Sequence, residues 1–144
     1  MIRYYMRSRA VMPVLMALAA IVMGSVSLAA QSSAVTPSVV VQDQSILDSR
    51  VVILKVVSAA PGWIMIHADN AGKPGAVLGY AAVRAGENLN VVVAVDAKKA
   101  TPQLYAMLHV DAGTVGTLEF PGPDAPTMNA GAMVSPAFKV TLPM

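Results

Sequence analysis

The strongest constraint on the fold is a series of short segments, rich in β-branched and aliphatic residues, that follow one another after residue 38. Stretches that contain Gly and Pro, such as A-P-G and N-A-G-K-P-G, separate them. Short strands with such breaks are typical of antiparallel sandwiches and barrels. The predicted strands are SVVVQ (38–42), RVVILKVVS (50–58), GWIMIHAD (62–69), AVLGYAAV (76–83), NVVVAVD (90–96), QLYAMLHVD (103–111), VGTLEF (115–120) and FKVTL (138–142).

The number and length of these runs predict an all-β fold. We expect an immunoglobulin-like or Greek-key antiparallel β-sandwich of about seven or eight strands. No segment has the 3.6-residue periodicity of an amphipathic helix. Residues 121–133 begin with three prolines in six positions, which a central strand does not tolerate, so we predict an irregular crossing before the last strand.

The first 30 residues have the composition of a secretory leader. Three arginines and no acidic residue stand within the first nine positions, and an uncharged apolar run follows. Ser27 and Ala29 form a small-residue cleavage signal. An uncleaved signal anchor is the alternative, because residues 10–30 are long enough to span a bilayer. Both alternatives predict a secreted or cell-envelope location. The predicted organisation is a signal peptide or anchor (1–30), a linker (31–38) and a single β-sandwich domain (39–144).

Charge and composition argue against several function classes. With the three leader arginines removed, seven Lys and Arg remain against eight Asp and Glu, which gives a mature charge of −1. Without a basic patch, nucleic acid is not an expected partner. The absence of cysteine excludes a disulfide framework. There is no G-x-S-x-G or H-E-x-x-H motif and no paired set of carboxylates, so we predict that the domain is not an enzyme.

The only two histidines lie in matching M-x-H-x-D segments, each with a glycine close behind. Alternation puts the aliphatic side chains of both strands on one face, which we expect to be the core because it has no polar atom that needs a partner. The opposite assignment would bury Trp63, as immunoglobulin-like domains do on their third strand. The face opposite the aliphatic one holds Trp63, Met65, His67, Tyr105, Met107 and His109. On this face Trp63 and Tyr105 are the predicted contact surface, outward or under the 121–133 loop.

The two strands are expected to be antiparallel neighbours. Pairing them end to end sets residue 63 against about 111, with His67 opposite Met107 and His109 opposite Met65. The histidines would then be diagonal, with Cβ atoms roughly 7–8 Å apart. A slip of two residues would put them face to face.

Two imidazoles and two thioethers on one face suit copper. The candidate metal ligands are Met65, His67, Met107 and His109. Asp69 and Asp111 could orient the neighbouring imidazoles, as outer-shell carboxylates do. The simpler interpretation is structural: each ring packs on the sheet, while the two Asp residues cap turns with the following glycines.

Several short motifs carry a resemblance to a known family: Asp43-Gln44, Gly62-Trp63, Ile66-His67, Gly79-Tyr80, Gly86-Glu87-Asn88, Ala106-Met107-Leu108-His109-Val110-Asp111 and Glu119-Phe120-Pro121-Gly122. From about residue 41 to 140 the chain resembles a secreted domain of unknown function found in archaeal and bacterial surface and exported proteins. The resemblance implies a β-sandwich, export, and frequent attachment to larger surface proteins. It implies no reaction.

The leading hypothesis is therefore an exported, non-catalytic β-sandwich module without a cofactor. It would have a structural or adhesive role at the cell surface or in the extracellular space, with a protein or surface partner. The membrane would be involved only through an uncleaved leader. The alternative is a periplasmic or extracellular copper-binding domain that uses the Met and His residues. A hydrolase would need a pocket that holds a perturbed carboxylate or histidine.

We predict that the leader is removed near Ala29 or Ala30 during export. The order of an Arg-rich start, an apolar run and a small-residue exit is the reason. N-terminal sequencing of the exported protein should begin within the linker. A sequence that begins at Met1 would contradict this prediction.

Overall fold

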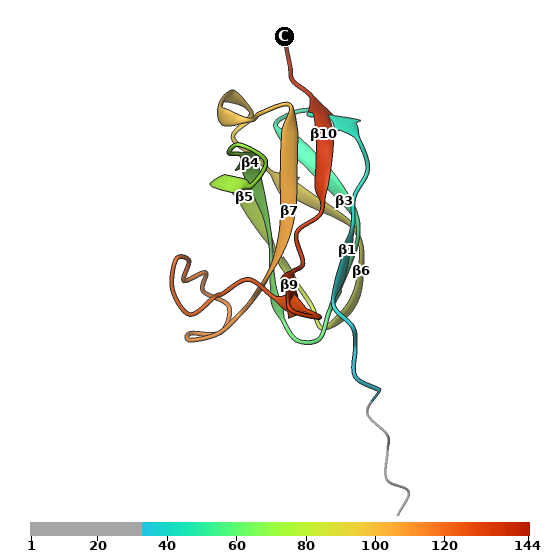
Figure 1. The fold of residues 1–144 in the computed structure, drawn as a ribbon, viewed down its shortest axis with the longest axis vertical. Helices are drawn as coiled ribbons and strands as arrows, with labels where there is room; N and C mark the ends of the chain where they lie inside the picture. The colour runs from blue at the N-terminus through green and yellow to red at the C-terminus, as the bar shows by residue number, and fades with distance from the viewer. Residues whose placement is uncertain (1–32) are drawn as a thin grey trace, which may run out of the picture. The chain divides into compact units, whose positions relative to one another are not determined.

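The alternating strands fold into the predicted all-β architecture in residues 33–144, the part of the chain that this computed structural model describes (Figure 1). Helical structure in this part is limited to the 3-10 turn η1 (Ala97–Lys99). The strands are β1 (Ser38–Val40), β2 (Gln44–Ser45), β3 (Arg50–Ser58), β4 (Gly62–Asp69), β5 (Pro74–Val83), β6 (Gly86–Ala94), β7 (Gln103–Val110), β8 (Met128–Asn129), β9 (Ala132–Met133) and β10 (Ala137–Thr141).

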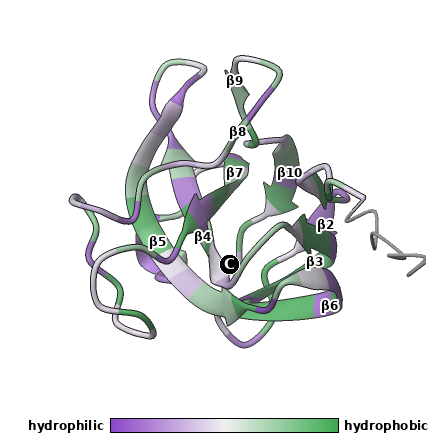
Figure 2. Ribbon diagram, turned by 90° about the horizontal axis from the view of Figure 1, so that it is seen from below, coloured by the Kyte–Doolittle hydropathy of each residue, from purple (hydrophilic) through white to green (hydrophobic). Residues whose placement is uncertain are grey.

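Two main sheets form the sandwich. The smaller has the strand order β1-β3-β6, and the larger has the order β2-β10-β7-β4-β5. All pairs within them are antiparallel except β2 with β10. Strands β8 and β9 form a separate hairpin. Figure 2 looks along the long axis of Figure 1 and shows β4, β7 and β10 apart from β3 and β6. The sandwich prediction is confirmed.

The core lies between the two sheets and consists of aliphatic side chains with one phenylalanine. The predicted choice of face is correct: the aliphatic side of β4 and β7 points into this core. Apolar side chains are driven there because their burial removes them from water without leaving polar atoms unpaired. The core from β4 and β7 comprises Ile64, Ile66, Ala68, Leu104, Ala106 and Leu108, and the facing sheet adds Val51, Ile53, Val56 and Val93.

Two predictions between β7 and β10 were wrong. Residues 115–120 form turns instead of a strand, and Gly113 and Gly116 adopt positive φ angles that strand residues do not have. Residues 121–133 are not wholly irregular, because they contain the β8–β9 hairpin. Its two turn residues, Ala130 and Gly131, both have positive φ, the conformation that matches the twist of a tight hairpin.

Strands β4 and β7 are antiparallel neighbours, as predicted, but in a different register. Trp63 pairs with His109 and Met65 with Met107, so β7 is shifted by two residues from the expected end-to-end pairing. Gly62 permits close approach at the end of the pair, because a Cβ atom there would lie 2.3 Å from the carbonyl oxygen of His109. A shift of two residues keeps every side chain on its face, so the core assignment was unaffected.

The leader predictions lie outside the described residues. The first described strand, β1, begins at Ser38, within one residue of the expected start of the domain. Across residues 33–144 there is no helix with the length and apolar character needed to cross a membrane.

Candidate functional site

The second face of β4 and β7 is also buried. Side chains at every position from Trp63 to Ala68 and from Leu104 to His109 are shielded, so the two strands are covered on both sides. Trp63 and Tyr105 are each only 7% exposed, and the Trp63 ring packs edge-on against Tyr80 with centroids 5.8 Å apart. Of the two predicted placements, outward or under a loop, the structure has both side chains covered. The contact role of Trp63 and Tyr105 stays a prediction.

The loop that follows β7 covers this second face. The Phe120 ring stands edge-on to both histidine rings, 4.9 Å from His109 and 6.2 Å from His67. Pro126 forms a β-bridge with His109, which brings the segment after the loop alongside β7. The cover therefore comes from residues 111–127, partly upstream of the segment that the sequence indicated.

Met65 and Met107 lie at the centre of this face. They are directly opposite each other across β4 and β7, and they are 1% and 4% exposed. The register sets His67 beside one end of this pair and His109 beside the other. The two imidazole rings nevertheless lean together, nearly parallel at 13° with centroids 6.0 Å apart. The structure thus brings all four predicted ligand residues into one buried cluster, which we call the Met/His cluster.

Both histidines have the same hydrogen-bonding pattern. His67 Nδ1 donates to the carbonyl oxygen of Gly75 at 2.8 Å, and His109 Nδ1 donates to the carbonyl oxygen of Asp124 at 2.9 Å. A carbonyl oxygen only accepts, so the proton of each neutral ring is on Nδ1 and the lone pair is on Nε2. Both Nε2 atoms are buried without a hydrogen-bond partner. Each ring therefore directs an unused nitrogen lone pair into the interior.

Asp69 and Asp111 accept hydrogen bonds from the backbone of turns and not from the imidazoles. Asp69 Oδ1 accepts from the backbone N–H of Gly72 and from the Tyr105 hydroxyl, at 3.1 and 3.0 Å. Asp111 Oδ2 accepts from the backbone N–H of Gly116 at 2.8 Å. Neither carboxylate bonds to a histidine. The structural interpretation is correct for both, and the prediction that they orient the rings was wrong.

Asp124 is the residue that sequence reasoning missed. Its carboxylate is fully buried and accepts from the backbone N–H groups of Ala112 and Glu119, each at 2.7 Å. Its own carbonyl oxygen holds the His109 ring. One residue therefore closes the covering loop and sets the orientation of His109. The only sequence signal was an acidic residue between prolines in P-G-P-D-A-P.

A pocket of about 590 Å³ opens beside the Met/His cluster. Its lining contains no carboxylate, and its one charged side chain is Lys73. Across residues 33–144, no group of three or more His, Cys, Asp or Glu side chains is arranged to hold a metal. A metal at this site would therefore need the thioethers as ligands. The lining residues are His67, Lys73, Pro74, Gly75, Met107, Phe120, Pro126 and Met133.

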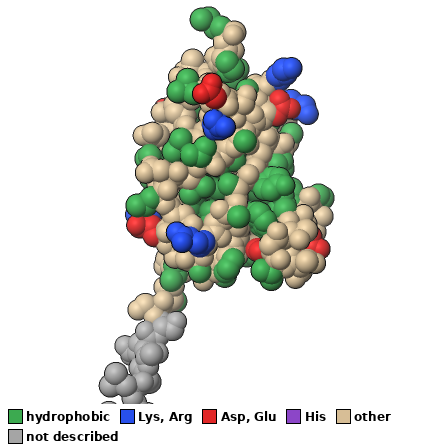
Figure 3. All heavy atoms as spheres, turned by 180° about the vertical axis from the view of Figure 1, so that it is seen from behind, with side chains coloured by type: hydrophobic (Ala, Val, Ile, Leu, Met, Phe, Trp, Pro, Cys, Tyr) green, Lys and Arg blue, Asp and Glu red, His purple; other side chains and the backbone are tan. Residues whose placement is uncertain are grey.

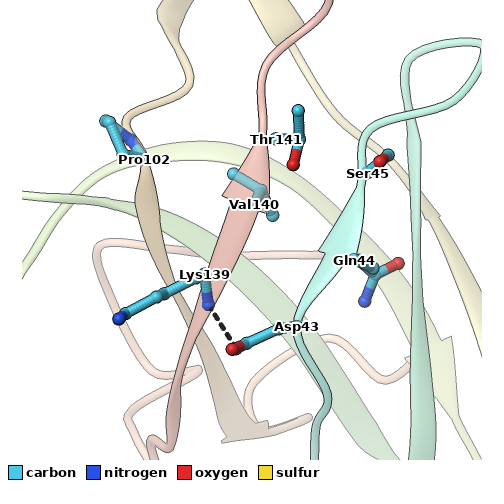
Figure 4. A pocket seen from close by; sticks show the side chains of 7 residues that line it. All are labelled: Asp43, Gln44, Ser45, Pro102, Lys139, Val140 and Thr141. Carbon is cyan, nitrogen blue, oxygen red and sulfur yellow. Dashed lines mark hydrogen bonds between the residues drawn. The ribbon is translucent and has the colours of Figure 1, made fainter.

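A second hollow of about 540 Å³ lies where β2 meets β10 (Figure 4). Its polar groups serve the fold. Asp43 Oδ1 accepts from the backbone N–H of Lys139 at 2.8 Å, and the Lys139 side chain points away from it. The Gln44 amide bonds with both its ends to the main chain of Val52, at 2.8 and 2.9 Å. These residues join β2 to both sheets. The hydrogen bonds of Asp43 and Gln44 go to the main chain, so these side chains do not form a ligand site in the hollow.

The surface carries few charges. In the view from behind, Lys, Arg, Asp and Glu side chains are scattered among hydrophobic ones and do not gather into a patch of one sign (Figure 3). The two ion pairs among residues 33–144, Lys55 with Glu87 and Lys99 with Asp96, are largely exposed and contribute little to stability. The Met/His cluster is thus the most distinctive chemical feature of the described chain.

The fold and the site define an antiparallel β-sandwich whose larger sheet carries a covered Met/His cluster on its outer face. A family model for a domain of unknown function (DUF7282) matches residues 37–141, and the chain belongs to this family. The predicted membership of a domain-of-unknown-function family is confirmed, while the surface and export setting stays a prediction. Comparisons with curated proteins and with solved structures found no match.

We predict that Asp124→Ala loosens the covering loop and lowers the free energy of unfolding by about 2–4 kcal/mol, because two backbone N–H groups lose a charged acceptor. Chemical denaturation checks this value. Asp43→Ala is the matched control, since its carboxylate accepts one backbone hydrogen bond at an exposed position. An effect of Asp124→Ala no larger than that of Asp43→Ala would contradict the central role of Asp124.

The pKa of His109 predicts a pH dependence of stability. Burial lowers this pKa, the hydrogen bond to Asp124 opposes the change, and the charge of His67 lowers the pKa further. Below the ordinary value of about 6.5 the unfolded chain binds the proton more readily than the folded domain, so stability is complete above that pH and falls as the pH falls.

Thermal unfolding of metal-free protein between neutral and mildly acidic pH measures this effect. His109→Asn keeps a donor for the Asp124 carbonyl and removes the titrating group, so its stability should vary less with pH. Equal pH slopes for the wild type and His109→Asn would show that His109 is not the group responsible.

Proposed function

We propose that this domain is an exported, non-catalytic β-sandwich module that binds Cu(I) in the Met/His cluster. The ligands would be the Nε2 atoms of His67 and His109 and the thioether sulfurs of Met65 and Met107. The leader supports export, and the buried Met/His cluster supports a binding role.

One observation carries the proposal: both buried histidines leave Nε2 without a partner. A buried polar atom without a hydrogen bond costs roughly 1–3 kcal/mol, so folding tolerates such atoms only where something compensates. In metal sites the second ring nitrogen of a ligating histidine donates to a carbonyl or carboxylate, which fixes the tautomer and orients the ring. His67 and His109 both have this arrangement, with Gly75 and Asp124 as the acceptors.

The surrounding atoms favour a soft monovalent ion. Thioethers and imidazoles bind Cu(I), whereas Ca²⁺ and Mg²⁺ require oxygen ligands. A cluster of neutral ligands in an apolar setting also disfavours divalent ions, because it offers no negative charge to offset theirs. The chain has no cysteine, so the cluster does not have the Cys ligand of a blue-copper electron-transfer site.

A structural or adhesive module is the second candidate. Three large apolar side chains, Val40, Leu89 and Val92, are between 41% and 61% exposed on the β1-β3-β6 sheet and offer a partner an apolar surface. In this alternative the Met/His cluster only packs the covering loop against the sheet. The two candidates differ in a single measurable property, which is whether the folded domain binds Cu(I).

We expect the mature domain to take stoichiometric Cu(I) from the Cu(I)–bicinchoninate complex under anaerobic conditions. Met107→Leu and His109→Asn should weaken binding at least as much as the loss of an outer-shell contact, roughly 10–100-fold. Met144→Leu removes a fully exposed methionine and is the matched control. Trp63, the only tryptophan, is paired with His109, so its fluorescence should change on binding.

Absorption at the copper K-edge should show both sulfur and nitrogen neighbours. Thermal unfolding of each variant without metal separates the loss of ligands from the loss of the fold. A wild-type domain that leaves all Cu(I) with bicinchoninate would contradict the proposal and favour the structural module.

A further inference from the structure

The β8–β9 hairpin displays two methionines beside the pocket. Met128 and Met133 are cross-strand partners, so their side chains lie next to each other on one face of the hairpin. They are 55% and 50% exposed, and Met133 lines the same pocket as His67 and Met107. One methionine of the exposed pair, Met133, and one of the buried pair, Met107, thus line the same pocket.

The hairpin is held to the strand that carries the buried ligands. Leu108 lies between Met107 and His109, and its N–H donates to the carbonyl oxygen of Val134 at 3.0 Å. Its carbonyl oxygen accepts from the N–H of Thr127 at 2.8 Å. Thr127 and Val134 in turn close the base of the hairpin with a bond of 3.0 Å. The backbone therefore fixes Met128 and Met133 relative to the Met/His cluster.

The methionines of the described chain are concentrated at this place. Of the five that follow residue 32, two are buried in the Met/His cluster and two stand on the hairpin. The fifth, Met144, is at the C-terminus, at the opposite end of the domain from β9 in Figure 1. Leucine or valine would give the hairpin the same apolar character, so the shared feature of these four side chains is the thioether sulfur.

We propose that Met128 and Met133 form an entry site that captures Cu(I) at the surface and passes it to Met107 and the Met/His cluster. This inference rests on the proposed function. The transfer is a ligand exchange: a thioether bond to Cu(I) forms at Met107 as one at Met133 breaks. The copper keeps its oxidation state, and no proton is released because a thioether has none and each neutral imidazole binds through Nε2, which is already unprotonated.

The burial of the ligands favours such a step. Met65 and Met107 are almost wholly covered, so an ion held by a carrier in solution has little access to them. Bare Cu(I) would lose its ligands before it gained new ones, at a large cost in an apolar pocket. Surface thioethers can bind Cu(I) while the carrier still holds it, so the ion is never without ligands during the transfer.

Stopped-flow transfer from Cu(I)–bicinchoninate to the mature domain tests the entry site. The double variant Met128→Leu/Met133→Leu has nearly the same volume and is expected to keep the thermal midpoint of the wild type. Its transfer rate should fall roughly tenfold or more, in both directions, while the equilibrium constant changes much less. Met144→Leu removes one exposed thioether outside the pocket and should transfer copper at the wild-type rate.

Each outcome has a distinct meaning. Slow transfer with the affinity retained supports the entry site. Wild-type transfer by the double variant overturns it and leaves the buried site intact. An affinity loss as large as that of Met107→Leu also overturns it, because Met128 or Met133 would then be a permanent ligand. If the wild type binds no Cu(I), the proposed function itself fails, and the entry site fails with it.

Discussion

The pairing of β4 with β7 is the interaction on which the rest of the domain depends. Each strand satisfies its backbone hydrogen bonds through its neighbours in the sheet, so both faces of the pair can be buried at little polar cost. One face supplies the aliphatic core between the two sheets. The other supplies the Met/His cluster, with Met65 opposite Met107. The same ladder thus fixes the stability of the sandwich and the geometry of the candidate site.

The loop over the second face is held by polar bonds as well as by apolar packing. The loop over it has few hydrophobic side chains besides Phe120, and the Asp124 carboxylate holds it through two backbone N–H groups. A buried carboxylate is costly unless several donors surround it. Because the Asp124 carbonyl also holds His109, loop closure and ring orientation are coupled. The Nε2 atoms of both histidines are buried side by side in one cluster without a hydrogen-bond partner.

The two proposals assign Cu(I) binding to a buried group of ligands and to an exposed pair of thioethers. The buried pair of thioethers and imidazoles has the orientation and low polarity that suit a retained soft ion. The exposed pair on the β8–β9 hairpin has the access that capture from a carrier requires. Leu108 connects the buried and the exposed pair, because its backbone N–H and carbonyl groups bond to Val134 and Thr127 at the base of the hairpin. Its side chain lies in the core between the two sheets. An exported module of this kind would hold copper without catalysing a reaction.

The sequence by itself determined the fold class, most strand positions, the inward aliphatic face and the grouping of Met65, His67, Met107 and His109 on one face. All of these follow from the period of two along each strand. The tertiary structure alone decided the register of β4 against β7, because a slip of two residues leaves both faces unchanged. It also decided that the second face is covered and that Trp63 and Tyr105 are buried. The cover depends on the hydrogen bonds of Asp124, and Trp63 packs against Tyr80 on β5. Such contacts between separate segments leave no periodic signal in the sequence.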